Sequence, residues 1–427
     1  MVEQASWIKT YTNKFVQNAW LYNLVGFLIW PFGFTLAAFR YWDNPWSKNV
    51  FWLFCVFFGY TFIISDLGWA DSGYYAYLFN QYTHTDPSLK TLWRSFYSVG
   101  SGYDDIASPL ITFLISRFTS NPSILFAVFG LIFGYFYSRN IWYVLERTTV
   151  KPAGFVILYM LTFIFLNSIW NINGFRYYVA AQMFLFGVLP FLVEGKKTRL
   201  VWAVVSFFFH FSFSIGLGIL LLFLLIGNRR TLYLGFFIVS AFIREINLEF
   251  LQSYITFLPE IFSNKVVNYT NPQAIEALSI ARQTASWFVT FSITALRWSV
   301  YAAVLFIFLV EKNTLNERKD LSSLFSFSLL FFGFANVVSL IPSGSRFILV
   351  SGMFMFAFLI FFFSDQREKK GIRLLRLFTI PLLTLFLLVS LRMGMDFFGV
   401  MTLIGNPITV LLYSDHVPLI EAIKSLF

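Results

Sequence analysis

The chain has 427 residues, of which 58% are apolar and only 12% are charged, and its mean hydropathy is +0.70. Soluble globular domains carry about a quarter charged residues and just under half apolar ones. This composition excludes a soluble enzyme, a nucleic-acid-binding protein and a disordered chain. It is typical of a polytopic membrane protein, because about 20 consecutive apolar residues span a bilayer as one helix.

Charge and cysteine content narrow the class further. In a membrane protein, a net charge of +10 is better explained by basic cytoplasmic loops than by binding to nucleic acid. Cys55 is the one cysteine, and the three histidines are scattered, so we expect no protein-bound metal and no cofactor. The first apolar run begins late, near Ala19, without a cleavage site after it, so no cleavable signal peptide is expected.

Continuous apolar runs predict the membrane spans and exclude a transmembrane β-barrel, whose strands would alternate apolar and polar residues. We expect an all-α fold of about 10–12 transmembrane helices, forming a single integral domain over residues 1–427 without internal repeats. Two shorter apolar segments, 106–118 and 397–413, are expected either to lie at the membrane interface or to re-enter the membrane. The longer runs lie at 19–39, 49–65, 121–138, 152–170, 174–193, 231–247, 286–310, 321–341, 346–364 and 374–391.

The segment 200–227 differs from the other runs. As one straight helix it would be about 42 Å long, against a hydrocarbon core of about 30 Å. Its middle is polar, with His210 and two serines. It therefore predicts a re-entrant hairpin of two half-helices with His210 at the tip. Basic residues flank it on both sides, namely Lys196, Lys197, Arg199, Arg229 and Arg230.

The basic residues also predict the orientation. With an extracytoplasmic amino terminus and a re-entrant 200–227, more than half of the 31 Lys and Arg residues fall on the cytoplasmic side, as the positive-inside rule requires. A single crossing at 200–227 would place the later basic clusters outside. Two polar stretches then face outward: a loop with a short interfacial helix at 66–120, and an amphipathic segment at 248–285.

The first outer stretch combines acids with aromatic rings. Asp71, Tyr74, Tyr75 and Asp104 are our candidates for substrate binding, because carboxylates accept hydrogen bonds from sugar hydroxyls and ring faces cover sugar C–H groups. The alternative is that these are interfacial aromatics and solvated charges. Asp71 with Asp104 or Asp105 is also a conceivable cation site.

Several arginines interrupt apolar sequence. Arg176 begins a predicted span, Arg297 lies inside one, and Arg346 closes a tight loop between two. Cations at membrane depth usually face a polar cavity, and the arginine fork fits phosphate oxygens. Arg176 and Arg346 have no acid near them in sequence, so we expect both to bind a diphosphate, and Arg297 is a further candidate for substrate binding. The alternative for each is a structural ion pair or a snorkelling side chain.

His210 is the one histidine expected within the membrane. It suits a general base or a hydrogen-bond donor, although a lone histidine is more often structural. The sequence contains no close carboxylate pair on one helix, phosphate-binding loop, nucleophile elbow or zinc-protease motif.

Taken together, these residues resemble the EpsG family of Wzy-like bacterial polysaccharide polymerases. The resemblance covers roughly residues 60–365. It is carried by Asn173-Gly-Phe-Arg-Tyr-Tyr-Val-Ala-Ala181, the basic turn Lys196-Lys197, Ser206-Phe-Phe-Phe-His-Phe-Ser212, Ala70-Asp-Ser-Gly-Tyr-Tyr-Ala-Tyr77, the stretch from Ser101 to Leu125, and Gly344-Ser-Arg-Phe347.

Two positions depart from the family pattern. Tyr177 stands where the family often has glutamine, so that glutamine's role is not inherited, and Tyr177 becomes a candidate for substrate binding in its own right. Asp104 and Asp105 stand where the family commonly has one acid.

The resemblance implies a GT-C-like glycosyltransferase in the bacterial cytoplasmic (inner) membrane, with its active site facing outward. It would join oligosaccharide repeat units linked to undecaprenyl diphosphate into exopolysaccharide or O-antigen. Arg176 and Arg346 would bind the diphosphate, His210 would lie near the acceptor or the donor phosphate, and Asp71, Tyr74 and Tyr75 would bind sugar. Donor and acceptor lipids and the bilayer are the implied partners, a chain-length regulator is a candidate, and nucleic acid is not expected.

Two alternatives share this topology. A ligase would move a finished glycan onto another acceptor, and sequence does not separate it from a polymerase. A flippase or other transporter would be expected to show repeat symmetry with broken helices at the midplane. The sequence shows no repeat.

Overall fold

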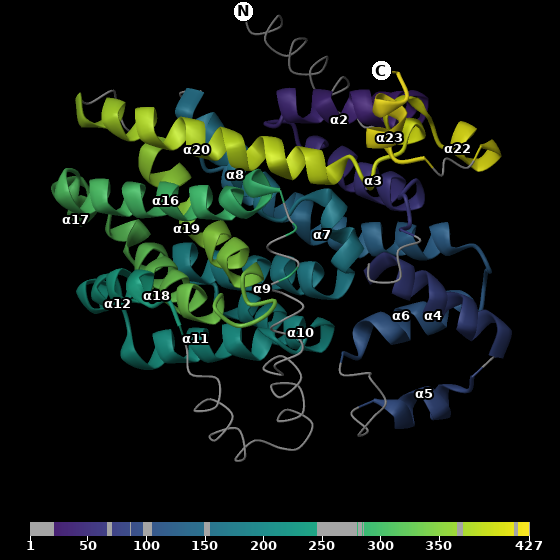
Figure 1. Ribbon diagram of the computed structural model, residues 1–427, viewed down its shortest axis with the longest axis horizontal. Helices are drawn as coiled ribbons and strands as arrows, with labels where there is room; N and C mark the ends of the chain where they lie inside the picture. Colours follow the sequence, from purple (N-terminus) through teal and green to yellow (C-terminus); the bar gives the residue numbers. More distant parts are fainter. Residues whose placement is uncertain are drawn as a thin grey trace, which may run out of the picture.

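The computed structural model describes residues 21–65, 71–85, 87–96, 105–148, 154–245, 280, 284, 286–364, 370–413 and 417–426. In this part of the chain the regular structure is helical, and one isolated antiparallel bridge joins Gly399 to Pro418. The predicted all-α fold is therefore confirmed. The long helices run side by side along the longest dimension of the molecule (Figure 1).

The helices follow the predicted apolar runs closely. A first helical stretch covers 21–29. The others are α2 (Pro31–Arg40), α3 (Ser47–Tyr60), α4 (Asp71–Thr85), α5 (Leu89–Ser95), α6 (Ala107–Ser116), α7 (Pro122–Leu145), α8 (Gly154–Leu166), η1 (Ile169–Gly174), α9 (Phe175–Glu194), η2 (Lys197–Leu200), α10 (Val201–Phe209), α11 (Phe213–Ile226), α12 (Arg230–Phe242), α16 (Trp287–Leu309), α17 (Lys312–Glu317), η3 (Lys319–Leu321), α18 (Ser322–Val338), α19 (Arg346–Ser364), α20 (Lys370–Gly394), α21 (Val400–Ile404), α22 (Thr409–Leu412) and α23 (Leu419–Lys424).

Within the described residues, six helical stretches are long and apolar enough to cross a bilayer, so the protein is a polytopic membrane protein. One of these stretches, Gly154–Glu194, contains two helices, α8 and α9, which run in opposite directions along α19. Three further apolar helices are shorter. The long ones are Pro122–Leu145, Gly154–Glu194, Trp287–Leu309, Lys319–Val338, Arg346–Ser364 and Gly371–Gly394, and the shorter ones are α6, α11 and α12.

Two sequence features explain the packing. Helix α19 is apolar all round and lies at the centre, with 89% of its span buried. Helices α3 and α7 pack closely where glycine faces backbone. A Cβ on Gly130 would lie 2.2 Å from the Cys55 carbonyl oxygen, and one on Gly59 equally close to that of Phe126. Small residues allow such close helix contacts in membranes.

One predicted span is interrupted. The run 19–39 was expected as a single helix, but helical residues 21–29 end before Trp30, and α2 starts at Pro31. Proline at the first helical position needs no amide partner, so it begins a new helix readily. The region 66–120, expected as a loop with one short helix, contains α4, α5 and α6. Apart from residues 280 and 284, the segment 248–285 lies outside the described residues.

Charged side chains define one end of the bundle, which we call the basic end. Lys48 at the start of α3 pairs with Glu146 after α7 at 3.4 Å. Glu194 at the end of α9 pairs with Arg147 and, at 2.5 Å, with Lys196. In Figure 1 this end lies toward α17, and α4 and α6 lie at the other end.

The segment 200–227 is broken at the predicted residue. Backbone torsions of His210 are extended (φ −154°, ψ 119°), which ends α10 and precedes α11. The two helices run in opposite directions along α9. Trp202 contacts Phe186 near the end of α9, and His210 contacts Tyr177 near its beginning.

Helix α11 then returns along α9. Phe213 contacts Tyr177 and Phe184, and a Cβ on Gly216 would meet the Phe184 ring. Ser322 bonds to Asn228 beyond α11, toward the basic end. These contacts support the predicted hairpin, whose position in a membrane remains a prediction.

Cysteine labelling tests this topology. We expect single cysteines at Lys197 and Arg229 to react with a membrane-impermeant maleimide only from the cytoplasmic side, because both would flank a re-entrant hairpin. The native Cys55 is buried, and a Cys55→Ala background removes it. Labelling of the two positions from opposite sides would contradict the hairpin and reverse the orientation of every helix after it.

Candidate functional site

The side chain of Arg176 lies at the end of the bundle opposite the basic end, which we call the site end. It occupies the first turn of α9, where a cation is unfavourable because the helix dipole is positive there. Two groups from other elements compensate. Asp105 Oδ2 lies 3.4 Å from Arg176 Nη1, and the Tyr75 hydroxyl accepts a hydrogen bond from Arg176 Nε at 3.3 Å.

Asp105, which precedes α6, contacts both α9 and the break between α10 and α11. Its side chain is 2% exposed, whereas that of Arg176 is 31% exposed. Besides contacting Arg176, it accepts a hydrogen bond through Oδ1 from the Phe211 amide at 2.8 Å, at the break between α10 and α11. A buried carboxylate requires such partners. The sequence indicates Asp105 only as a cation ligand, because the Asp104-Asp105 pair is its one local feature.

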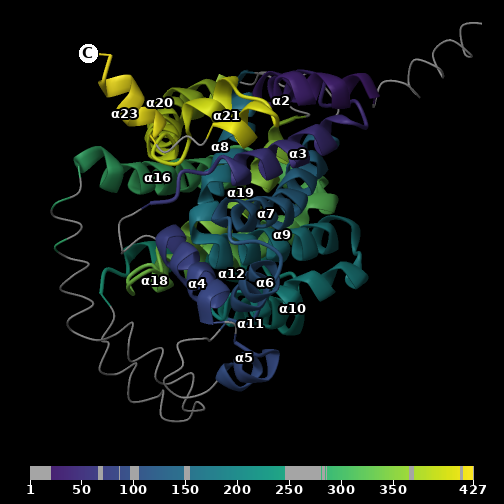
Figure 2. The same ribbon diagram turned by 90° about the vertical axis from the view of Figure 1, so that its right-hand side faces the viewer.

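Helix α4 covers Arg176. Tyr75 is 1% exposed, and burial raises the pKa of its hydroxyl to about 12 even though the Arg176 charge acts in the opposite direction. The hydroxyl is therefore neutral at physiological pH. Its neighbour Tyr74 is exposed, with ring centroids 6.2 Å apart. Figure 2 views the molecule from this end and shows α4 and α6 in front.

His210 is oriented by the turn that follows it. Its Nδ1 accepts a hydrogen bond from the Ser212 amide at 3.2 Å and lies 2.7 Å from Ser212 Oγ. Because Nδ1 is the acceptor, the neutral ring carries its proton on Nε2 and is a hydrogen-bond donor there. The ring packs edge-on against Tyr177, with centroids 5.2 Å apart.

Arg346 contacts the same tyrosine. It is the first residue of α19, and its guanidinium lies over the Tyr177 ring, 5.6 Å from the centroid. The loop before it makes a close turn: Ser343 has a positive φ of 62°, and a Cβ on Gly344 would lie 1.9 Å from the Val338 carbonyl oxygen. Glycine is therefore required at position 344.

These groups line one cavity of about 210 Å³. Most of its exposed lining is apolar, and its polar side chains are those of Tyr177, His210, Ser212, Ser343 and Arg346. The apolar part of the wall comes from α11, α18, the loop after α18, and α19, through Ile215, Val338, Ile341 and Phe347 respectively. A charged group beside an apolar surface is suited to an amphiphile with an anionic head.

Asp71 lies at the beginning of α4, against the beginning of α9. Its Oδ2 would be 3.3 Å from a Cβ placed on Gly174, so glycine leaves room for the carboxylate. The Ser72 amide donates to Asn173 Oδ1 at 3.2 Å, which fastens α4 to η1. Asp71 is close enough to Arg176 for electrostatic interaction.

Of the other two candidates, Arg297 lies away from this cluster and Asp104 is not among the residues that the structure describes. Arg297 lies on α16, one turn before Tyr301, whose hydroxyl donates to Asn336 at 2.9 Å. The main partner of α16 is α20. Within the described ranges, no three His, Cys, Asp or Glu side chains form a group that could hold a metal ion.

The structure thus gathers Asp71, Tyr75, Arg176, Tyr177, His210 and Arg346 from four separate parts of the chain. The expectation that Arg176 lacks an acidic partner holds only along the sequence, because Asp105 balances it in space. Arg346 and His210 face the cavity, whereas Arg176 forms the neighbouring polar layer.

The comparison with protein families gives one match. The EpsG family model matches residues 50–399, most of the chain, including every described member of this cluster. No curated protein and no solved structure matches the chain. The GT-C-like architecture therefore remains a prediction.

Proposed function

Because the chain belongs to the EpsG family of membrane proteins associated with exopolysaccharide synthesis, we propose that it polymerises polyprenyl-diphosphate-linked oligosaccharide repeat units. The reaction would take place on the extracytoplasmic side of the bacterial cytoplasmic membrane. The observation that carries this proposal is the cavity in which Arg346 and His210 adjoin an apolar wall. A polyprenyl diphosphate has the matching order of groups, an anionic head followed by an apolar chain.

The proposed chemistry is one substitution. An acceptor hydroxyl attacks the anomeric carbon of the donor glycan, a C–O bond forms, and the bond to the diphosphate breaks. Negative charge moves onto the leaving diphosphate, where the Arg346 guanidinium and the His210 Nε2 proton stabilise it. The structure favours His210 as a donor over a general base, because its Nδ1 is engaged by Ser212.

The proton of the acceptor hydroxyl needs an acceptor of its own. We assign this role to the Asp71 carboxylate, which lies beside the first residues of α9. A carboxylate within hydrogen-bond reach of a hydroxyl can take its proton as the new bond forms. Tyr74, exposed on the same helix, would complete the sugar-binding surface. Tyr75 and Tyr177 are buried, and their role would be to hold Arg176 and Arg346 in place.

Replacing Asp71 tests this assignment. We expect Asp71→Asn to keep the packing against Gly174 and to reduce polymer formation in cells by about 10²- to 10⁴-fold, the usual contribution of proton transfer. The measurement is polymer amount and length at matched membrane protein levels. Asn80→Asp, on the exposed face of the same helix, is the control. Normal polymer from Asp71→Asn would remove this residue from the site.

The proposed function itself requires a purified system. We expect the protein in nanodiscs, supplied only with polyprenyl-diphosphate-linked repeat units, to produce a ladder of lipid-linked polymers and one free polyprenyl diphosphate per bond formed. A ligase would instead transfer glycan to a separate acceptor without any ladder. A transporter would move the lipid across the bilayer and leave the glycan length unchanged.

A further inference from the structure

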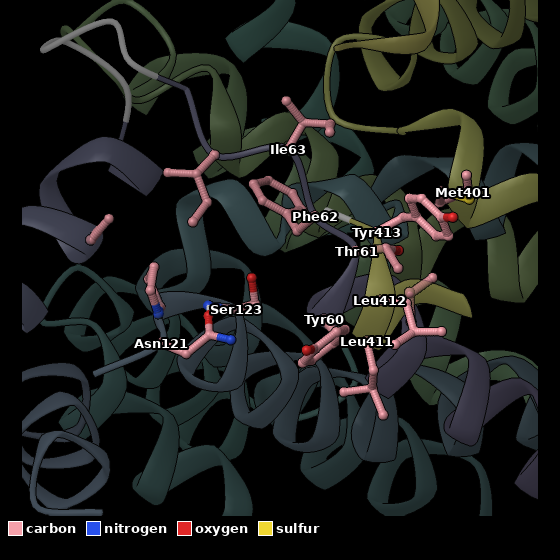
Figure 3. A pocket seen from close by; sticks show the side chains of 14 residues that line it. Tyr60, Thr61, Phe62, Ile63, Asn121, Ser123, Met401, Leu411, Leu412 and Tyr413 are labelled. Atoms are coloured by element: carbon pink, nitrogen blue, oxygen red, sulfur yellow. Dashed lines mark hydrogen bonds between the residues drawn. The ribbon is translucent and has the colours of Figure 1, made fainter. Parts of the chain in front are cut away.

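A second and larger cavity, of about 580 Å³, lies beside the cluster. Its walls come from the end of α3 and the residues that follow it, from α4, from the start of α7 and from the C-terminal segment. Figure 3 shows Asn121 and Ser123 on one side, and Met401, Leu412 and Tyr413 on the other. Its volume is in the usual range for ligand sites, 300–1,000 Å³.

The lining has a distinct chemistry. Hydroxyl and amide groups come from Tyr60, Thr61, Asn121, Ser123 and Tyr413, and none of the residues that line this cavity is charged. Hydroxyls and amides donate and accept hydrogen bonds, as sugar hydroxyls do. Tyrosine rings add flat apolar faces. A diphosphate would find no cation here, whereas neutral sugar residues match the lining.

This cavity adjoins the cluster that contains Arg176 and Arg346, and helix α4 lies between the two. Ala76 on α4 lines it, and the preceding residue, Tyr75, contacts Arg176. A series of aromatic contacts also links the cavity to the cluster. Phe62 stacks on Phe126 with centroids 5.1 Å apart, and Phe129, one turn further along α7, packs against Tyr75 at 5.4 Å.

The outer wall belongs to this chain's own C-terminal segment. Thr402 bonds to Thr61 through their hydroxyls at 2.8 Å, which holds the segment against the end of α3. Residues 410–413 then form the rim. They lie beyond the region 50–399 that the EpsG family model matches. The cluster lies inside the matched region, whereas residues 410–413 lie outside it.

We propose that this cavity binds uncharged sugar residues of the lipid-linked repeat unit, and that its C-terminal wall selects among them. The inference rests on the proposed function for the identity of the glycan. In this arrangement the diphosphate lies at Arg346 and the sugars extend past Tyr75 and α4 toward Tyr413.

Binding can be measured without turnover. The probe is the lipid-free oligosaccharide released by mild acid from the surface polysaccharide of the cell that carries this gene, titrated onto the protein in nanodiscs by saturation-transfer NMR. We expect binding to wild type and a loss of about threefold to tenfold in Tyr413→Ala, the value of one aromatic contact. Asn121→Ser, whose hydroxyl can cap α7 in place of the asparagine amide oxygen, should also weaken binding.

The controls separate this inference from the proposed function. Tyr41→Ala, an exposed tyrosine near the basic end, and Arg346→Lys should both bind the oligosaccharide as wild type does. Binding that Tyr413→Ala lowers would support the cavity even if no ladder forms. Normal ladders with unchanged oligosaccharide binding in both cavity variants would overturn it and leave the polymerase proposal intact. If added lipid displaced the oligosaccharide, the cavity would be a lipid-binding site, and the sugar-binding proposal would also be overturned.

Discussion

Replacing Arg346 with lysine is expected to slow repeat-unit extension by about a hundred- to a thousand-fold. Removing one preorganised contact to developing negative charge typically costs about 3–4 kcal/mol. Lysine keeps the charge, but it loses the planar fork that contacts two phosphate oxygens at once. The guanidinium also stacks over Tyr177, 5.6 Å from its centroid, an arrangement that an ammonium group reproduces poorly. Polymer ladders from purified protein measure the rate.

The matched control is an arginine at the end of another helix. Arg392 near the end of α20 pairs with Asp396 at 2.9 Å, and both side chains are nearly half exposed. Such exposed pairs contribute little, so Arg392→Lys should extend repeat units at close to the normal rate. Equal ladders from Arg346→Lys and Arg392→Lys would show that Arg346 only anchors α19, and would remove the cation from the proposed leaving-group site.

Helix positions were predictable because hydropathy alone specifies a membrane span. The run expected at 346–364 is α19 to the residue, and the break at His210 follows from a segment too long and too polar in its middle for one crossing. The region 66–120 was harder to interpret. Helix α4 mixes polar residues with tyrosines, and such a composition resembles a loop unless its buried face is known.

The candidate site was only partly predictable, because its contacts join distant parts of the chain. Arg176, His210 and Arg346 could be recognised as polar residues in apolar surroundings. Their contacts could not be predicted from the sequence, since Asp105 lies 71 residues before Arg176. Arg297 shows the opposite case. It carries the same sequence signal as Arg346, yet α16 packs mainly on α20 and holds it beside Tyr301.

Asp105→Asn should be the most destabilising single change at the site. The amide oxygen can still accept the Phe211 hydrogen bond, so the variant removes the charge and little else. Removing one partner of a buried ion pair costs about 3–5 kcal/mol, because the other charge remains buried and unpaired. Arg176 is 31% exposed, which places the expected loss at about 3 kcal/mol, the lower end of that range. Thermal unfolding in detergent measures it.

A double substitution distinguishes the ion pair from a general loss of packing. Asp105→Asn combined with Arg176→Gln removes both charges, so it should recover much of the thermal stability that the single change loses. Extension should stay low in the double variant, because α9 and the α10–α11 break no longer share a charged contact at the site end. Asp396→Asn is the matched control and should unfold nearly like wild type, because its pair with Arg392 is exposed. An equal loss of stability in Asp105→Asn and Asp396→Asn, without recovery in the double variant, would show that the Asp105–Arg176 pair does not hold the site together.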